Sequence, residues 1–273
     1  MEIENLVDKK IIETVLNKLN INYSNHKYFT DGASSRVILL NNQYLIKQNS
    51  KLALQAEVTF LTHNKSEMFQ KLIYVDPNFE FVVYSFITGN VMKKVENPLS
   101  TFKKLIEIVS TYPDFSGNEF GYLDEPTISW SDFLNQEINH SSSNLSSIPI
   151  NSEFAYSQIH ILEQYPFSKK LLHGDFGTHN FIEENNSLKG IIDPMTIAGD
   201  PLYDLLFAFV SNTDFVLNIS LEKLYSLIDE PIEKINSLLI IVLYSRFSRC
   251  LKYHPKDIDV YLNLWNKLIN YKN

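Results

Sequence analysis

The chain has 273 residues and a net charge of −8, from 24 basic and 32 acidic side chains. This length allows one large domain or two lobes with a substantial core, and the acidic balance argues against nucleic acid as the main partner. A single cysteine, Cys250, excludes a disulfide within the chain and indicates a reducing compartment. Because no apolar run reaches roughly 20 residues and the N-terminus lacks a signal pattern, we expect a cytoplasmic protein with no membrane partner.

The first third of the chain predicts a small antiparallel sheet. Residues 1–20 carry apolar side chains at helical spacing and predict an amphipathic helix. Three short β-prone segments follow, YSNHKYF, SRVILL and QYLIKQ, with turn residues between them at 31–32 and 41–42. Two further strands, KLIYV and EFVVYSFI, are joined by a turn at residues 76–78.

One helix is expected between the third and fourth strands. Residues Ser50–Asn64 return to a helical period, and their apolar face is predicted to consist of Leu52, Ala56, Phe60 and Leu61. The remainder of the chain is mostly helical in pattern. We therefore predict a nucleotide-binding lobe at residues 1–87 and a helical catalytic and acceptor-binding lobe at residues 88–273.

Polar residues and glycines are concentrated in LLHGDFGTHNF, which begins at Leu171. Asp175 and Asn180 have the D-x-x-x-x-N spacing by which a kinase catalytic loop places its base and a magnesium ligand. The carboxylate must accept the proton of an attacking hydroxyl, while a neutral amide oxygen nearby faces the metal. Gly174 and Gly177 permit the tight backbone path that this arrangement needs.

A second metal ligand is predicted at the end of GIIDP, where Asp193 follows an apolar strand. A hairpin fits between Asn180 and Asp193, with strands at Phe181–Glu184 and Leu188–Ile192 and a turn at residues 185–186. Folding this hairpin returns Asp193 to the side of Asn180. Two oxygen ligands together are what Mg²⁺ prefers at a phosphoryl-transfer site.

A lysine near the end of the third predicted strand indicates a phosphate site. Lys47 lies among apolar residues in YLIKQ and needs a partner, and Glu57 lies on the next helix. Kinases use such a lysine–glutamate pair to hold the nucleotide phosphates. Upstream, FTDGASSRVILL predicts a hairpin turn in which the backbone N–H groups of Ser34 and Ser35 lie over the phosphates.

The order of these motifs resembles the aminoglycoside phosphotransferase and choline kinase-like superfamily, which shares the protein kinase fold. HGDFGTHNF resembles its catalytic loop, GIIDP its metal-binding segment, and AGDPLYDLLFAF its G-D-P-x-x-D-L segment. The resemblance covers Phe29–Phe209. It implies a bilobal α+β fold, in which a small antiparallel sheet with one inserted helix precedes a larger, mainly α-helical lobe.

The resemblance also implies the roles of individual residues. Carried over by position, the predicted site comprises the base Asp175, the metal ligands Asn180 and Asp193, the phosphate-binding pair Lys47 and Glu57, the phosphate-loop residues Ser34 and Ser35, and the hinge residues Ser85, Phe86 and Ile87, whose backbone would meet the adenine. His173 and Asp204 resemble the family's structural supports of the loop.

These predictions favour a kinase that moves the γ-phosphoryl group of ATP or GTP, with Mg²⁺, to a hydroxyl of a small molecule. The resemblance implies an aminoglycoside or related antibiotic as acceptor and a role in antibiotic resistance; an amino alcohol or a sugar is the alternative. The negative charge favours a cationic acceptor, and the carboxylates that could attract it are Glu119, Asp124, Glu125, Asp132, Glu137, Asp200 and Asp204. We expect a monomer or a weak homodimer.

Two other functions fit parts of the sequence. His173, Asp175 and His179 form H-x-D-x-x-x-H, which is a plausible transition-metal cluster for a metallohydrolase. That function leaves Lys47 and Glu57 without a role. A nucleotide-binding regulatory module without turnover is the other alternative, but the chain has the lysine, the base and both metal ligands that turnover requires.

Overall fold

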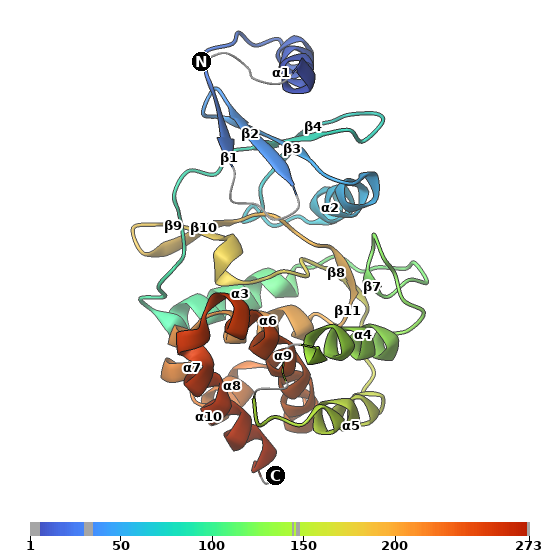
Figure 1. The fold of residues 1–273 in the computed structure, drawn as a ribbon, viewed down its shortest axis with the longest axis vertical. Coiled ribbons are helices and arrows are strands. Elements are labelled where there is room, and N and C mark those ends of the chain that lie inside the picture. Colours follow the sequence, from blue (N-terminus) through green and yellow to red (C-terminus); the bar gives the residue numbers. More distant parts are fainter. Residues whose placement is uncertain (1–5, 30–34, 144, 146–147, 272–273) are drawn as a thin grey trace.

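The computed structural model describes residues 6–29, 35–143, 145 and 148–271. Its N-terminal part is a five-stranded antiparallel sheet with the strand order β1-β2-β3-β5-β4 (Figure 1). The strands are β1 (His26–Phe29), β2 (Arg36–Leu40), β3 (Tyr44–Gln48), β4 (Leu72–Val75) and β5 (Val82–Ser85), and two helices accompany them, α1 (Leu6–Leu19) and α2 (Lys51–His63). Each predicted strand is confirmed. The turn expected at 31–32 lies outside the described residues.

The two helices pack on opposite faces of the sheet. Because side chains alternate along a strand, Ile46 of β3 and Val83 of β5 share one apolar cluster with α1. The neighbouring Val82 and Tyr84 share another cluster with Leu54 of α2. The same alternation places Lys47 on the face that α2 covers.

The predicted apolar face of α2 is confirmed at Ala56 and Phe60, which are buried, but not at Leu52. Leu52 is 59% exposed, whereas Leu54 and Glu57 are buried. The Glu57 carboxylate is paired with Lys47, whose Nζ lies 2.8 Å from Oε2. A buried charge needs its partner, so Glu57 is buried together with Lys47, which apolar spacing alone does not reveal.

The larger C-terminal part is mainly helical and lies below the sheet in Figure 1. Its helices are α3 (Pro98–Ser110), α4 (Trp130–Ser142), α5 (Ser152–Leu162), α6 (Leu202–Ser211), α7 (Thr213–Asn218), α8 (Leu221–Leu227), α9 (Ile232–Tyr253) and α10 (Ile258–Ile269). The central helix α9 is buried along most of its length and shares one large apolar core with its neighbours. The predicted α+β class, a small sheet followed by a larger helical part, is confirmed.

Two small sheets lie between the N-terminal sheet and the helices. Their strands are β6 (Asn90–Val91), β9 (Phe181–Glu184) and β10 (Ser187–Ile191) in one, and β7 (Gly121–Tyr122), β8 (Lys170–Leu172) and β11 (Ile197–Gly199) in the other. The predicted hairpin is confirmed, because β9 pairs antiparallel with β10 and residues 185–186 turn the chain in the left-handed region. The division of the chain after residue 87 stays a prediction.

Across the described ranges of the chain, helices are either too short or too polar to cross a membrane.

Candidate active site

The predicted catalytic loop connects the end of β8 to β9. It begins at His173 and ends in a short 3₁₀ turn, Thr178–Asn180, whose first N–H donates to Oγ of Ser211 on α6 at 3.1 Å. Gly174 has a φ of +80°, and a Cβ there would lie 2.2 Å from the backbone oxygen of Met195. The Met195 N–H also donates to the His173 carbonyl at 2.8 Å. Only glycine therefore lets the loop lie this close to the segment that follows β10.

Asp204 of α6 supports the loop from beneath. Its carboxylate accepts hydrogen bonds from the backbone N–H groups of His173, at 2.8 Å, and Gly174, at 3.1 Å, and from the Tyr112 hydroxyl at 2.8 Å. Complete burial raises the pKa of Asp204 to about 7, although these three donors act in the opposite direction. The predicted supporting role of Asp204 is confirmed. Tyr112 is an additional support that no sequence motif identified.

Replacing Asp204 with alanine is expected to lower the free energy of unfolding by about 2–4 kcal/mol, because two buried N–H groups and a hydroxyl lose their acceptor. Urea denaturation measures the change. Asp204→Asn keeps one acceptor oxygen and should cost less, and Tyr112→Phe, which removes one donor, should cost least. Equal stability of Asp204→Ala and the unmodified protein would contradict this role.

His173 is a buried, uncharged side chain that hydrogen-bonds the backbone on both sides of its ring. Its Nε2–H donates to the Ile192 carbonyl at 2.9 Å, and its Nδ1 accepts from the Asp175 N–H at 3.3 Å. Burial lowers the pKa of His173 to about 4, so the ring is uncharged at neutral pH. Both ring nitrogens are committed to the backbone, and the described part of the chain brings no three His, Cys, Asp or Glu side chains together as a metal site. His173 is therefore not free to act as a ligand in the H-x-D-x-x-x-H cluster of the metallohydrolase alternative.

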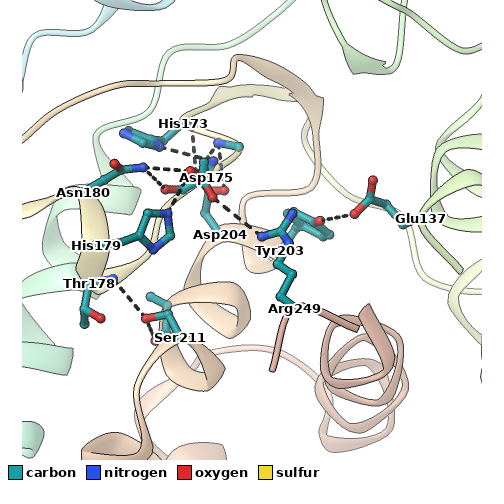
Figure 2. A network of polar contacts seen from close by, with 12 residues as sticks. Glu137, His173, Asp175, Thr178, His179, Asn180, Tyr203, Asp204, Ser211 and Arg249 are labelled. Atoms are coloured by element: carbon teal, nitrogen blue, oxygen red, sulfur yellow. Dashed lines mark hydrogen bonds and ion pairs between the residues drawn. The ribbon is translucent and has the colours of Figure 1, made fainter. Parts of the chain in front are cut away.

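Asp175 is held by three side chains (Figure 2). Its Oδ2 accepts from His179 Nε2 at 2.8 Å and from Asn180 Nδ2 at 2.9 Å, and its Oδ1 lies 3.6 Å from Arg249 Nη1. Burial acts to raise the pKa of Asp175, but the contacts with His179 and Arg249 outweigh it and hold the pKa at about 2. The carboxylate is therefore ionised at neutral pH and can accept a hydrogen bond from a hydroxyl.

Asn180 and Asp193 are the two oxygen-bearing residues of the predicted metal site, and a backbone hydrogen bond joins their segments. Asn180 Nδ2 donates to both the backbone oxygen and Oδ2 of Asp175, each at 2.9 Å, so its Oδ1 is the atom left to bind a cation. The Ile192 N–H donates to the Asn180 carbonyl at 3.0 Å. Because Asp193 directly follows Ile192, this bond holds the backbone of Asp193 near Asn180. Asp193 has a φ of +62°, and its side chain is 52% exposed. This all-oxygen donor set fits Mg²⁺.

Lys47 joins the N-terminal sheet to this loop region. Its Nζ donates to Glu57 Oε2 at 2.8 Å and also pairs with Asp193 Oδ1. Burial acts to lower the pKa of Lys47, but the two carboxylates outweigh it and raise the pKa above its ordinary value. The lysine is therefore charged. Burial raises the pKa of Glu57, and Lys47 opposes that shift.

The structure describes only some of the residues that are predicted to contact the nucleotide at the hinge and the phosphate loop. The Ser85 and Phe86 N–H groups donate to the Lys71 and Gln43 carbonyls at 2.9 and 2.8 Å. These two N–H groups are therefore already used within the protein. The predicted contact with adenine depends on the remaining backbone groups of residues 85–87, above all those of Ile87. Ser35 directly precedes β2, and Ser34 lies outside the described residues.

A cavity of about 360 Å³ adjoins the base through Arg249. Side chains of β7, α4, α9 and the segments after β7 and β10 line it: Tyr122, Asp124, Glu125, Glu137, His140, Ser141, Met195, Ser245, Ser248 and Arg249. Three of the seven predicted carboxylates thus face this cavity. Asp200 does not, because it pairs with Lys234 at 2.9 Å.

Arg249 is a site residue that the sequence motifs missed. It lies on α9, far along the chain from the catalytic loop, and its guanidinium packs 4.8 Å from the centre of the Phe207 ring. Its only signal in the sequence is a basic residue within a helix of mostly apolar character.

The small antiparallel sheet, the larger helical part and the loop between them define a protein kinase-like fold. Solved structures with the same fold include aminoglycoside phosphotransferase APH(4)-Ia, 13% identical with a TM-score of 0.65 over 96% of this chain and 98% of that one. The gentamicin complex of APH(2″)-IIa is 18% identical with a TM-score of 0.57 over 100% and 98%. ADP-bound APH(2″)-Ib is 17% identical with a TM-score of 0.57 over 97% and 100%.

The fold is therefore that of the aminoglycoside phosphotransferases. No protein-family model and no curated protein sequence matches the chain significantly. At identities of 13–18% the structural likeness establishes the fold, and function has to be argued from the site.

Proposed function

We propose that the protein is a phosphotransferase that moves the γ-phosphoryl group of ATP or GTP to a hydroxyl of a small molecule, most simply an aminoglycoside or related antibiotic. The observation that supports it best is the bridge from Lys47 to both Glu57 and Asp193. This bridge brings the predicted phosphate-binding pair to the predicted metal ligand, although they are far apart in the sequence. Asn180 then connects that ligand to Asp175.

Each of these residues has a part in the proposed reaction. Lys47 would bind phosphate oxygens, and Asn180 and Asp193 would hold Mg²⁺, which neutralises phosphate charge when bound. Asp175 would orient the acceptor hydroxyl and take its proton as the new O–P bond forms and the nucleoside diphosphate leaves. A carboxylate with a pKa of about 2 is a weak base, which suits a loose transition state in which the proton leaves late. Catalysis would then be mainly positioning and electrostatic stabilisation.

Structures of this fold support a nucleotide and a cationic acceptor. APH(2″)-Ib was solved with ADP, APH(2″)-IIa with gentamicin, and a mutant of APH(4)-Ia with AMP-PNP and hygromycin B. The carboxylates of Asp124, Glu125 and Glu137 in the cavity would suit positive charges on the acceptor. An amino alcohol or a sugar remains the alternative acceptor.

The test is a screen of aminoglycosides, macrolides, amino alcohols and sugars with ATP and with GTP in the presence of magnesium. Product mass identifies a phosphorylated acceptor, and release of nucleoside diphosphate gives the rate. Nucleotide binding without any phosphorylated product would instead support the regulatory module. Failure to bind either nucleotide would contradict the proposed function.

The KM for a polycationic acceptor is expected to rise with ionic strength, because salt screens its attraction to the carboxylates of the cavity. Each exposed pair contributes roughly 1 kcal/mol or less at low salt, so two or three pairs should change KM by about tenfold between low and high salt. The measurement varies sodium chloride at fixed free magnesium and saturating nucleotide. A neutral acceptor is the control, and its KM should stay constant. If the best acceptor is neutral, or if its KM does not change with salt, the predicted electrostatic attraction of the acceptor is wrong.

A further inference from the structure

Arg249 brings a positive charge to the candidate base. Its Nη1 lies 3.6 Å from Oδ1 of Asp175, and its side chain also lines the adjoining cavity. The guanidinium packs over the ring of Phe207 on α6, which restricts its movement. Figure 2 shows His179 and Asn180 on one side of Asp175 and Arg249 on the other.

The two oxygens of Asp175 have different surroundings. Oδ2 accepts hydrogen bonds from His179 and Asn180 at 2.8 and 2.9 Å. Oδ1 has Arg249 Nη1 at 3.6 Å, which is longer than a hydrogen bond. Oδ1 is therefore the oxygen that can accept the hydroxyl of the acceptor. A hydroxyl bound there would lie beside the guanidinium, together with the carbon atoms next to it.

The cavity wall also carries three carboxyl groups, together with His140 and neutral side chains. Asp124, Glu125 and Glu137 line the same space as Arg249, and in Figure 2 Glu137 lies beyond Arg249 as seen from Asp175. Tyr203 donates to Glu137 Oε2 at 3.2 Å, so this carboxylate is held in place. One cavity thus has a cation beside the base and anions elsewhere on its wall.

We propose that Arg249 is a specificity-determining residue, which selects acceptors whose reacting hydroxyl has no ammonium group on a neighbouring carbon. The proposal rests on the proposed function and narrows its acceptor. An ammonium next to the reacting hydroxyl would be repelled by the guanidinium at short range, where partly buried charges interact strongly. Ammonium groups farther from that hydroxyl would instead meet Asp124, Glu125 and Glu137.

The test uses two amino alcohols of one size and charge. In trans-2-aminocyclohexanol the ammonium is on the carbon next to the hydroxyl, and in trans-4-aminocyclohexanol it is across the ring; the matching 1,2- and 1,4-cyclohexanediols are neutral references. Dissociation constants are measured by ligand-observed NMR on the full chain loaded with magnesium and AMP-PNP, and phosphate transfer is measured separately with ATP. We expect the 4-amino compound to bind about tenfold more tightly than the 2-amino compound, with little difference between the diols.

Three variants distinguish the effect of the Arg249 charge from the effect of changing any arginine on α9. Arg249→Gln should abolish the preference between the two amino alcohols, while the ratio of the dissociation constants of the two diols stays near one; Arg249→Lys should keep the preference. Arg246→Gln is the matched control, because Arg246 is on the same helix but packs over Tyr261, 5.3 Å from its ring centre. The proposal would be overturned if Arg249→Gln kept the preference of the unmodified protein, if the unmodified protein showed no preference, or if neither amino alcohol bound. Preferential binding without phosphate transfer would support charge selection and count against the proposed kinase function.

Discussion

Replacing Asp193 with alanine is expected to reduce phosphoryl transfer by on the order of 10³–10⁵, because a metal site provides several kcal/mol of transition-state stabilisation. Asp193 supplies the one negative charge of the predicted magnesium site, and a water molecule cannot replace that charge. Excess magnesium should therefore restore little activity. The measurement is kcat against free magnesium at saturating nucleotide and acceptor.

Asn180→Ala is the matched comparison, because it removes a neutral ligand whose position water can fill. We expect a smaller loss that high magnesium partly reverses. Thermal unfolding of both variants checks that they fold, since Asp193 also pairs with Lys47. If both variants had the magnesium dependence of the unmodified protein, neither residue would be a metal ligand.

Replacing Asp175 with asparagine is expected to reduce kcat by on the order of 10²–10⁴, which is the usual contribution of a positioned proton acceptor. Asparagine has nearly the same shape, and its amide oxygen can still accept from His179 and Asn180. The fold and the affinity for nucleotide should therefore change little. Single-turnover rates with the best acceptor, together with nucleotide titration, distinguish a catalytic loss from a binding loss.

A variant at Asp132 is a suitable control for Asp175→Asn. Asp132 caps the start of α4 with Ser129 and is not among the residues that line the cavity. Asp132→Asn should keep the turnover of the unmodified protein. Wild-type turnover in Asp175→Asn with its true acceptor would show that another group takes the proton.

Local sequence determined most of the secondary structure and much of the site. Short β-prone segments separated by turn residues gave the five strands of the N-terminal sheet, because turn chemistry and alternation act over a few residues. The spacing of Asp175 and Asn180 was sufficient to predict one polar loop that holds both residues, and the structure adds the hydrogen bond between their side chains. The Asn185-Asn186 turn likewise fixed the hairpin that returns the chain to Asp193.

Tertiary structure decided which face of α2 is buried and what surrounds the base. Apolar spacing correctly favoured Ala56 and Phe60 for the core, but it also favoured Leu52, which is exposed, and it did not predict that Glu57 is buried against Lys47. Arg249 reaches the loop region from α9 and Tyr112 from the segment that follows α3, and nothing near either residue in the sequence specifies its partner. Such contacts depend on how whole helices pack around the core. Sequence spacing therefore predicts groups that one loop or hairpin holds together, whereas the charges around Asp175 and the adjoining cavity are brought together only when the helices pack.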